Sequence, residues 1–132
     1  MSKETRHPDL TVMVKAKELC TYVLKVTERM EKKYRYTLSL RLQNMSMEII
    51  EFLYLANEVY VTGQNKHVKY EERRQLQQKA LARIKMLAYF TTLAMEHRAI
   101  LMKQFAQISK LTSDCQNLIA AWIKSDQRRF GI

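Results

Sequence analysis

The sequence predicts an all-α fold, an up-down-up-down antiparallel four-helix bundle in a single domain spanning residues 1–132. Apolar residues recur at spacings of three and four in four runs of similar length, which is the period of one helix face. Two glycines and one proline provide too few turn formers for an all-β domain, which needs a turn roughly every 8 to 12 residues. Hydrophobic residues make up 47% of the chain, enough to build a core.

The first two helices are expected at about residues 9–29 and 37–62. In the first, the apolar positions alternate steps of four and three: Val12, Ala16, Leu19, Val23, Val26 and Met30. The second repeats this rhythm: Leu38, Leu42, Met45, Ile49, Phe52, Ala56 and Val59. Gly63 follows the second run in the position of a helix stop.

The third and fourth helices are expected at about residues 69–96 and 103–125. Glu71 and Glu72 suit the electropositive first turn of the third helix. Its apolar positions are Leu76, Ala80, Ile84, Leu87, Thr91 and Ala94. Those of the fourth are Phe105, Ile108, Leu111, Cys115, Leu118 and Trp122. The basic tail at 124–132 is expected to fray.

The second and third helices carry more apolar residues than one buried stripe needs. The surplus positions are Ile50, Leu53, Tyr54, Met86, Tyr89, Phe90 and Met95. A bundle of this size has little room to bury them internally, and large exposed apolar patches are uncommon on soluble monomers. The sequence therefore predicts contacts between subunits.

The net charge of +10, from 23 Lys and Arg against 13 Asp and Glu, indicates a polyanionic partner. The segment 32–41 holds four cations and no acid, with Tyr34 and Tyr36 between them. Phosphate-seeking charge beside stacking rings is typical of single-stranded nucleic-acid contacts. In the alternative interpretation, the two tyrosines close the end of the bundle and the lysines are only solvated.

The predicted topology places basic residues at both ends of the bundle. One pole, where the first and third helices end and the other two begin, gathers Arg29, Lys32, Lys33, Arg35, Arg41, Arg98 and Lys103. The opposite pole carries Lys66, Lys69, Arg73, Arg74, Lys124, Arg128 and Arg129. Of these, Arg73 and Arg74 join the first group as candidate contacts to nucleic acid or polymerase. Broad basic surfaces bind the nucleic-acid backbone with little reading of sequence.

The sequence gives no sign of catalysis or of a metal or cofactor site. The one Glu-x-x-His match, Glu4 to His7, lies in the polar N-terminal segment, away from any helix centre where a di-iron bundle needs it. There is no Gly-rich phosphate loop and no nucleophile elbow. We therefore expect a protein without enzymatic activity or a small-molecule substrate.

The chain also lacks the features of an exported or membrane protein. Its first residues are polar, and its longest uncharged stretches are about half the roughly 20 residues of a membrane span. Cys20 and Cys115 stand far apart among apolar residues, as buried free thiols do. These observations favour a cytoplasmic protein.

Several segments, taken together in their order and spacing, resemble a known family. They are Cys20-Thr21-Tyr22-Val23, Lys32-Lys33-Tyr34-Arg35-Tyr36-Thr37, Arg41-Leu42-Gln43-Asn44, Ile49-Ile50-Glu51, Ala56-Asn57-Glu58 and Ala121-Trp122-Ile123. This pattern, over roughly residues 15–126, is similar to the accessory variability determinant (Avd) proteins of diversity-generating retroelements. Those four-helix bundle proteins are related to proteins encoded in 23S rRNA intervening sequences.

The resemblance implies a homopentameric ring of basic bundles with no enzymatic activity of its own, in a bacterial or phage-infected cell. It also implies two partners, a reverse transcriptase and its template RNA or cDNA, in mutagenic reverse transcription. By position, Lys32, Lys33, Arg35 and Arg41 match the family's basic start of the second helix. The alternative is a structural, self-assembling bundle of the intervening-sequence type that does not bind nucleic acid directly.

Overall fold

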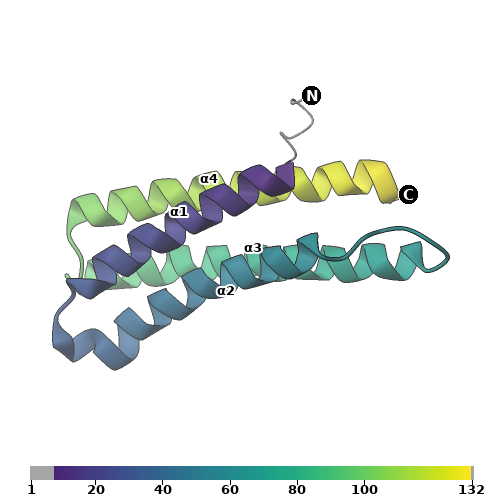
Figure 1. The fold of residues 1–132 in the computed structure, drawn as a ribbon. Coiled ribbons are helices and arrows are strands. Elements are labelled where there is room, and N and C mark those ends of the chain that lie inside the picture. Colours follow the sequence, from purple (N-terminus) through teal and green to yellow (C-terminus); the bar gives the residue numbers. More distant parts are fainter. Residues whose placement is uncertain (1–7, 132) are drawn as a thin grey trace.

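A computed structural model describes residues 8–131, and within that range the chain is helical with no β-strand. Its four α-helices are α1 (Pro8–Glu28), α2 (Leu40–Asn57), α3 (Lys66–Glu96) and α4 (Met102–Phe130). Figure 1 shows consecutive helices running in opposite directions along an elongated bundle. Contacts join α1 to α2 and α4, and α3 to the same two helices. The expected all-α, four-helix architecture is confirmed.

The core lies along the bundle axis and is built from the apolar stripes of the four helices. Steps of three and four place the stripe residues on one side of a helix, so each helix buries one face against the others. The largest apolar side chains with almost no exposed surface are Val12, Leu19, Val23, Leu42, Ile49, Leu53, Ile84, Leu87, Ile108 and Ile119. Each contributes about 1.5–3 kcal/mol through removal from water. Trp122 also lies in this core.

The second helix begins later than the sequence predicts, at Leu40 instead of residue 37. A short 3-10 helix (Lys32–Tyr34) and a five-residue π-helix (Arg35–Ser39) come before it. The wider π turn inserts an extra residue, which changes the residues that face inward. Ser39 is buried while Leu38, expected in the core, is half-buried.

The connection between α2 and α3 is longer than expected. α2 ends at Asn57, although helix was expected to residue 62, and α3 begins at Lys66 instead of residue 69. Valine and threonine at 59, 61 and 62 favour extended backbone over helix. The carbonyl of Val59 also accepts a hydrogen bond from Arg73 Nη1 at 3.3 Å. Gly63 adopts a φ of 81°, the left-handed turn conformation that glycine favours.

The fourth helix is longer than the sequence predicts and takes in most of the basic C-terminal tail. Helix α4 continues to Phe130 and extends past the start of α1 (Figure 1). Two tertiary contacts hold this extension. The carboxylate of Asp126 is buried against α3, and the ring of Phe130 lies 6.1 Å from that of Tyr70.

Both cysteines are free and buried, as expected. Burial, and to a smaller extent the neighbouring Asp114 carboxylate, raise the pKa of the Cys115 thiol to about 12. A thiol with such a pKa is almost entirely protonated at neutral pH and therefore a poor nucleophile.

Candidate nucleic-acid interface

The first pole forms as the topology predicts. The ends of α1 and α3 meet the starts of α2 and α4 at one end of the bundle (Figure 1). The phenol oxygen of Tyr34 donates a hydrogen bond of 3.4 Å to the carbonyl of His97, which links the 3-10 turn to the end of α3. The exposed cations at this pole are Arg29, Lys32, Lys33, Arg35, Arg41, Arg98 and Lys103.

These cations form few ion pairs within the described part of the chain. The single ion pair among them joins Lys33 Nζ to Glu31 Oε1 at 3.9 Å, and both side chains are well exposed. Such a pair is screened by solvent and contributes little. The pole therefore presents cations that remain available to an external anion.

The two tyrosines of the basic segment have different environments. Tyr34 is half-buried and hydrogen-bonded to His97, which favours the interpretation in which it closes the end of the bundle. The Tyr36 side chain is 79% exposed and borders an open groove of about 550 Å³. In the same groove, the Arg41 guanidinium lies 5.4 Å from the centre of the Phe90 ring. Tyr36 is therefore the one of the pair that presents a ring for stacking.

Arg98 occupies a strained backbone conformation with a φ of 58°. It follows the end of α3, where the Ala99 amide donates to the Ala94 carbonyl at 2.8 Å and the Arg98 amide to the Met95 carbonyl at 2.9 Å. This pair of bonds is a Schellman helix end, whose left-handed residue is usually glycine. An arginine at this position carries a conformational cost and places a cation at the tip of the pole.

Arg73, at the opposite pole, is not available to a partner. Its side chain is 9% exposed, and its guanidinium binds the buried carboxylate of Asp126 through Nε at 2.6 Å and Nη2 at 3.1 Å. The guanidinium also lies over the Trp122 ring. The prediction that Arg73 contacts nucleic acid is therefore wrong, because this cation is paired inside the fold. Arg74 is half-buried, and its Nη1 atom lies 3.8 Å from Oε2 of Glu71.

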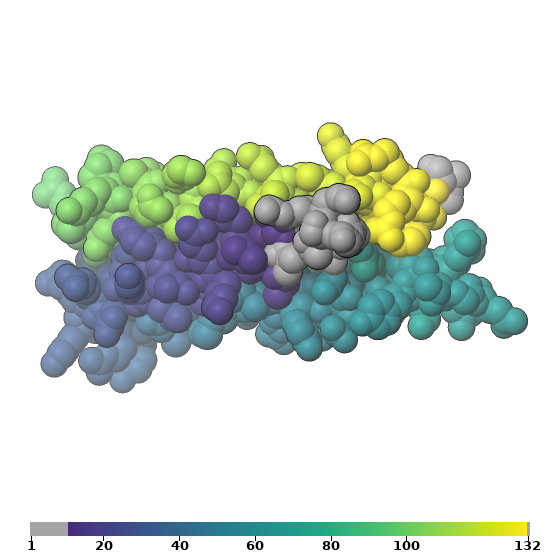
Figure 2. All heavy atoms as spheres, turned by 45° about the horizontal axis from the view of Figure 1, so that its top comes forward, coloured from purple at the N-terminus to yellow at the C-terminus, as the bar shows by residue number. Residues whose placement is uncertain are grey.

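Sequence reasoning placed the basic residues at the poles and missed the side of the bundle formed by α1 and α4. In Figure 2 these helices lie together along one face of the molecule. The acids Glu18 and Asp114 on this side are paired with Lys15 and Lys110. The exposed cations on or next to the two helices that lack an ion pair in the described range are Lys17, Lys25, Arg29, Lys103, Lys124, Arg128 and Arg129. The eight-residue spacing of Lys17 and Lys25 in the sequence of α1 could have indicated this basic side of the bundle.

The opposite side, formed by α2 and α3, exposes apolar residues beside the cations Arg41, Lys79 and Lys85. Leu40, Met47 and Tyr54 recur at seven-residue intervals on the outer face of α2 and are all exposed. Met86 and Tyr89 on α3 are exposed as well. The surplus apolar residues of the sequence are thus divided. Leu53 is buried and Ile50, Phe90 and Met95 are half-buried, while Tyr54, Met86 and Tyr89 face outward.

Two further results concern residues 8–131 as a whole. No helix there is apolar over a length sufficient to cross a membrane. No group of three or more His, Cys, Asp or Glu residues in that range is arranged to hold a metal ion, and the Glu4–His7 motif lies outside it. In comparisons with known proteins, the chain matches no family model, no curated protein and no solved structure.

Proposed function

We propose that this protein is a non-enzymatic accessory subunit of a reverse-transcriptase complex of the diversity-generating retroelement type. In this role it binds template RNA or cDNA and the polymerase, and it assembles with copies of itself as a ring, a pentamer in the family it resembles. One observation carries the nucleic-acid part of the proposal. The exposed cations at the first pole and on the α1/α4 side have almost no acidic partners in the described chain.

Unpaired cations over a broad surface suit a phosphate backbone. Each phosphate that a Lys or Arg neutralises releases condensed counterions, so affinity falls steeply as salt rises. The exposed apolar residues of α2 and α3 support a second, simultaneous contact. The cations of the first pole and of α1 and α4 face nucleic acid, and these apolar residues face protein.

RNA binding measured against salt concentration tests the nucleic-acid role. On single strands we expect a log–log slope of about 0.7 for each phosphate contact. Charge reversal of Arg35 and Arg41 should lower the affinity and the slope together, because both side chains are exposed at the pole. A flat salt response of the unmodified protein would refute backbone binding.

Co-purification with a reverse transcriptase tests the partner. We expect a stable complex whose mass, measured by light scattering, fits several copies of this chain. Recovery of the polymerase without this protein would contradict the proposal.

The exposed apolar side also favours a second candidate, a structural bundle that only self-assembles. Under this alternative the protein forms oligomers through α2 and α3 but has no specific affinity for RNA. The Arg35 and Arg41 variants distinguish the two candidates, because a purely structural bundle has no RNA affinity for them to weaken.

A further inference from the structure

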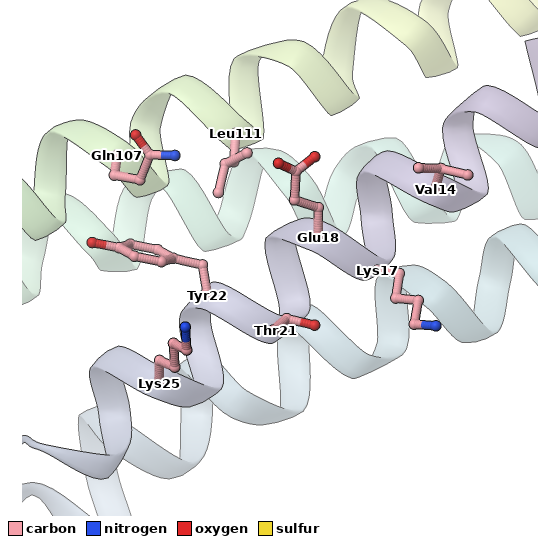
Figure 3. Close-up of a pocket in the computed structure, with 8 residues that line it drawn as sticks. All are labelled: Val14, Lys17, Glu18, Thr21, Tyr22, Lys25, Gln107 and Leu111. Carbon is pink, nitrogen blue, oxygen red and sulfur yellow. The ribbon is translucent and has the colours of Figure 1, made fainter.

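A groove runs between α1 and α4 on the basic side of the bundle. It has a volume of about 480 Å³ and contains apolar, aromatic, polar and basic side chains. Figure 3 shows Tyr22 reaching from α1 toward α4, where Gln107 and Leu111 lie. A second hollow, which shares Tyr22 and Lys25 with the first, continues the groove toward Arg29 at the pole.

The floor of this groove is apolar and its α1 rim is basic. Val14 and Tyr22 contribute hydrophobic surface, with the buried Leu111 beneath them. Lys17 and Lys25 are exposed on the rim, eight residues apart, which is about 12 Å along a helix. Arg29 follows directly after the end of α1 at the first pole, so the cations lead from the groove to that pole.

The acids near the groove leave this row positively charged. Glu18 lines the groove, but its carboxylate lies 3.2 Å from Lys15 Nζ. That pairing raises the pKa of Lys15, with the hydrogen bond to Glu18 as the largest cause. Glu28 is exposed beside Arg29 and has no ion pair within residues 8–131, so it is the acid that opposes an anion here.

Given the proposed function, on which this step rests, we infer that the groove between α1 and α4 holds an unpaired strand of RNA or DNA. Its bases lie against Tyr22 and Val14, and its phosphates lie along Lys17, Lys25 and Arg29. Basic grooves with aromatic floors bind single strands in this way, since bases stack on the rings while the charges follow the backbone.

The apolar floor selects a single strand over a duplex. A duplex presents phosphates outward and keeps its bases stacked inside, so it has little apolar surface to place against Tyr22 and Val14. It is also too wide to enter a groove between two packed helices, whose axes are about 8–10 Å apart. A duplex would contact only the rim cations.

Fluorescence anisotropy with a labelled, unstructured oligouridylate tests the inference, with a duplex of equal length as a second probe. We expect the full-length protein to bind the single strand more tightly. The double variant Lys17→Gln/Lys25→Gln should weaken this binding about tenfold and reduce the log–log salt slope by about 1.4, the value for two lost phosphate contacts. The matched control Lys79→Gln/Lys85→Gln removes two exposed charges from α3 and should change affinity less than about twofold.

The variant Tyr22→Leu tests the floor, because it keeps apolar bulk and removes the stacking ring. We expect the affinity for the single strand to fall about fivefold or more and the affinity for the duplex to stay unchanged. A thermal melt checks that Tyr22→Leu remains folded, and the lysine variants test the groove independently of that result. The variant Glu28→Gln should strengthen binding, since it removes the opposing acid.

Each contrary outcome has a distinct meaning. Unchanged binding by the Lys17/Lys25 variant, together with weaker binding by the Arg35/Arg41 variant, overturns the groove and leaves the proposed function standing. Equal binding of duplex and single strand also overturns the groove. If polyglutamate displaces the strand completely and Tyr22→Leu has no effect, an acidic protein segment is the occupant instead. If the unmodified protein shows no salt-dependent binding of RNA, the proposed function itself is refuted.

Discussion

The guanidinium of Arg73 and the carboxylate of Asp126 form a bidentate ion pair across 53 residues of sequence. The two side chains are 9% and 1% exposed. Gln77 donates a further hydrogen bond of 2.9 Å from Nε2 to the same carboxylate. The Val59 carbonyl accepts from the guanidinium, so one cluster joins the α2–α3 connection, α3 and the end of α4.

Breaking this pair should destabilise the fold strongly. Asp126→Ala leaves the Arg73 charge buried without its partner, and we expect the free energy of unfolding to fall by about 3–5 kcal/mol. Urea unfolding followed by circular dichroism measures this loss. The double variant Arg73→Met/Asp126→Leu removes both charges, so its free energy of unfolding should fall much less. Equal losses in the two variants would show that packing, and not the unpaired charge, dominates at this site.

Replacement of Arg98 by glycine should raise the stability of the fold while it lowers the affinity for RNA. Arg98→Gly removes the Cβ that disfavours a φ of 58°, so we expect a gain of roughly 0.5–1 kcal/mol in the free energy of unfolding. It also removes a cation from the pole, so RNA affinity should fall. Arg98→Ala removes the same charge and keeps most of the strain. It should therefore weaken binding equally without the gain in stability, and a stabilised Arg98→Ala would contradict the strain argument.

The Cys115 thiol should make the fold sensitive to alkaline pH. Its pKa is raised to about 12 in the folded protein, above the ordinary value of 9.0. The folded state therefore keeps this proton while the unfolded state releases it. The resulting stability is complete below about pH 9 and is lost progressively as the pH rises toward 12. Urea unfolding at several pH values, in Cys20→Ala and Cys20→Ala/Cys115→Ala backgrounds, isolates this effect from other titrating groups. Parallel pH profiles in the two backgrounds would refute it.

The apolar periodicity of the sequence predicts the buried side chains well, because the period of the helix decides which side chains lie on one face. Steps of three and four placed Val12, Ile49 and Ile84 in the core, and all three are fully buried. The fourth helix shows the limit of this reasoning. Ile119, one position from the expected Leu118, is fully buried, while Leu118 is half-buried at the edge of the core, because a stripe wider than one row admits both neighbours.

Features that depend on distant partners could not be predicted in this way. Arg73 looks like a surface cation in a basic stretch, and only the fold shows Asp126 beside it. The same pairing explains why α4 continues past Ser125, where the composition indicated a frayed tail. The groove between α1 and α4 likewise requires two helices that lie far apart in sequence, so Lys17 and Lys25 did not stand out as a site.

The exposed apolar stripe on α2 and α3 should mediate self-association. Met47 is 46% exposed and Tyr89 is 74% exposed on this side, and a contact between copies would bury both. A lysine within such a contact would leave an unpaired charge without water, at a cost of several kcal/mol. We therefore expect Met47→Lys/Tyr89→Lys to weaken assembly by about a hundredfold or more and to yield monomers in light scattering, with an unchanged melting temperature for the isolated bundle. The control Val68→Lys changes an exposed apolar residue near the start of α3, away from the stripe, and should leave the oligomer intact. A monomeric unmodified protein, or an oligomer that survives both substitutions, would mean that another surface mediates assembly.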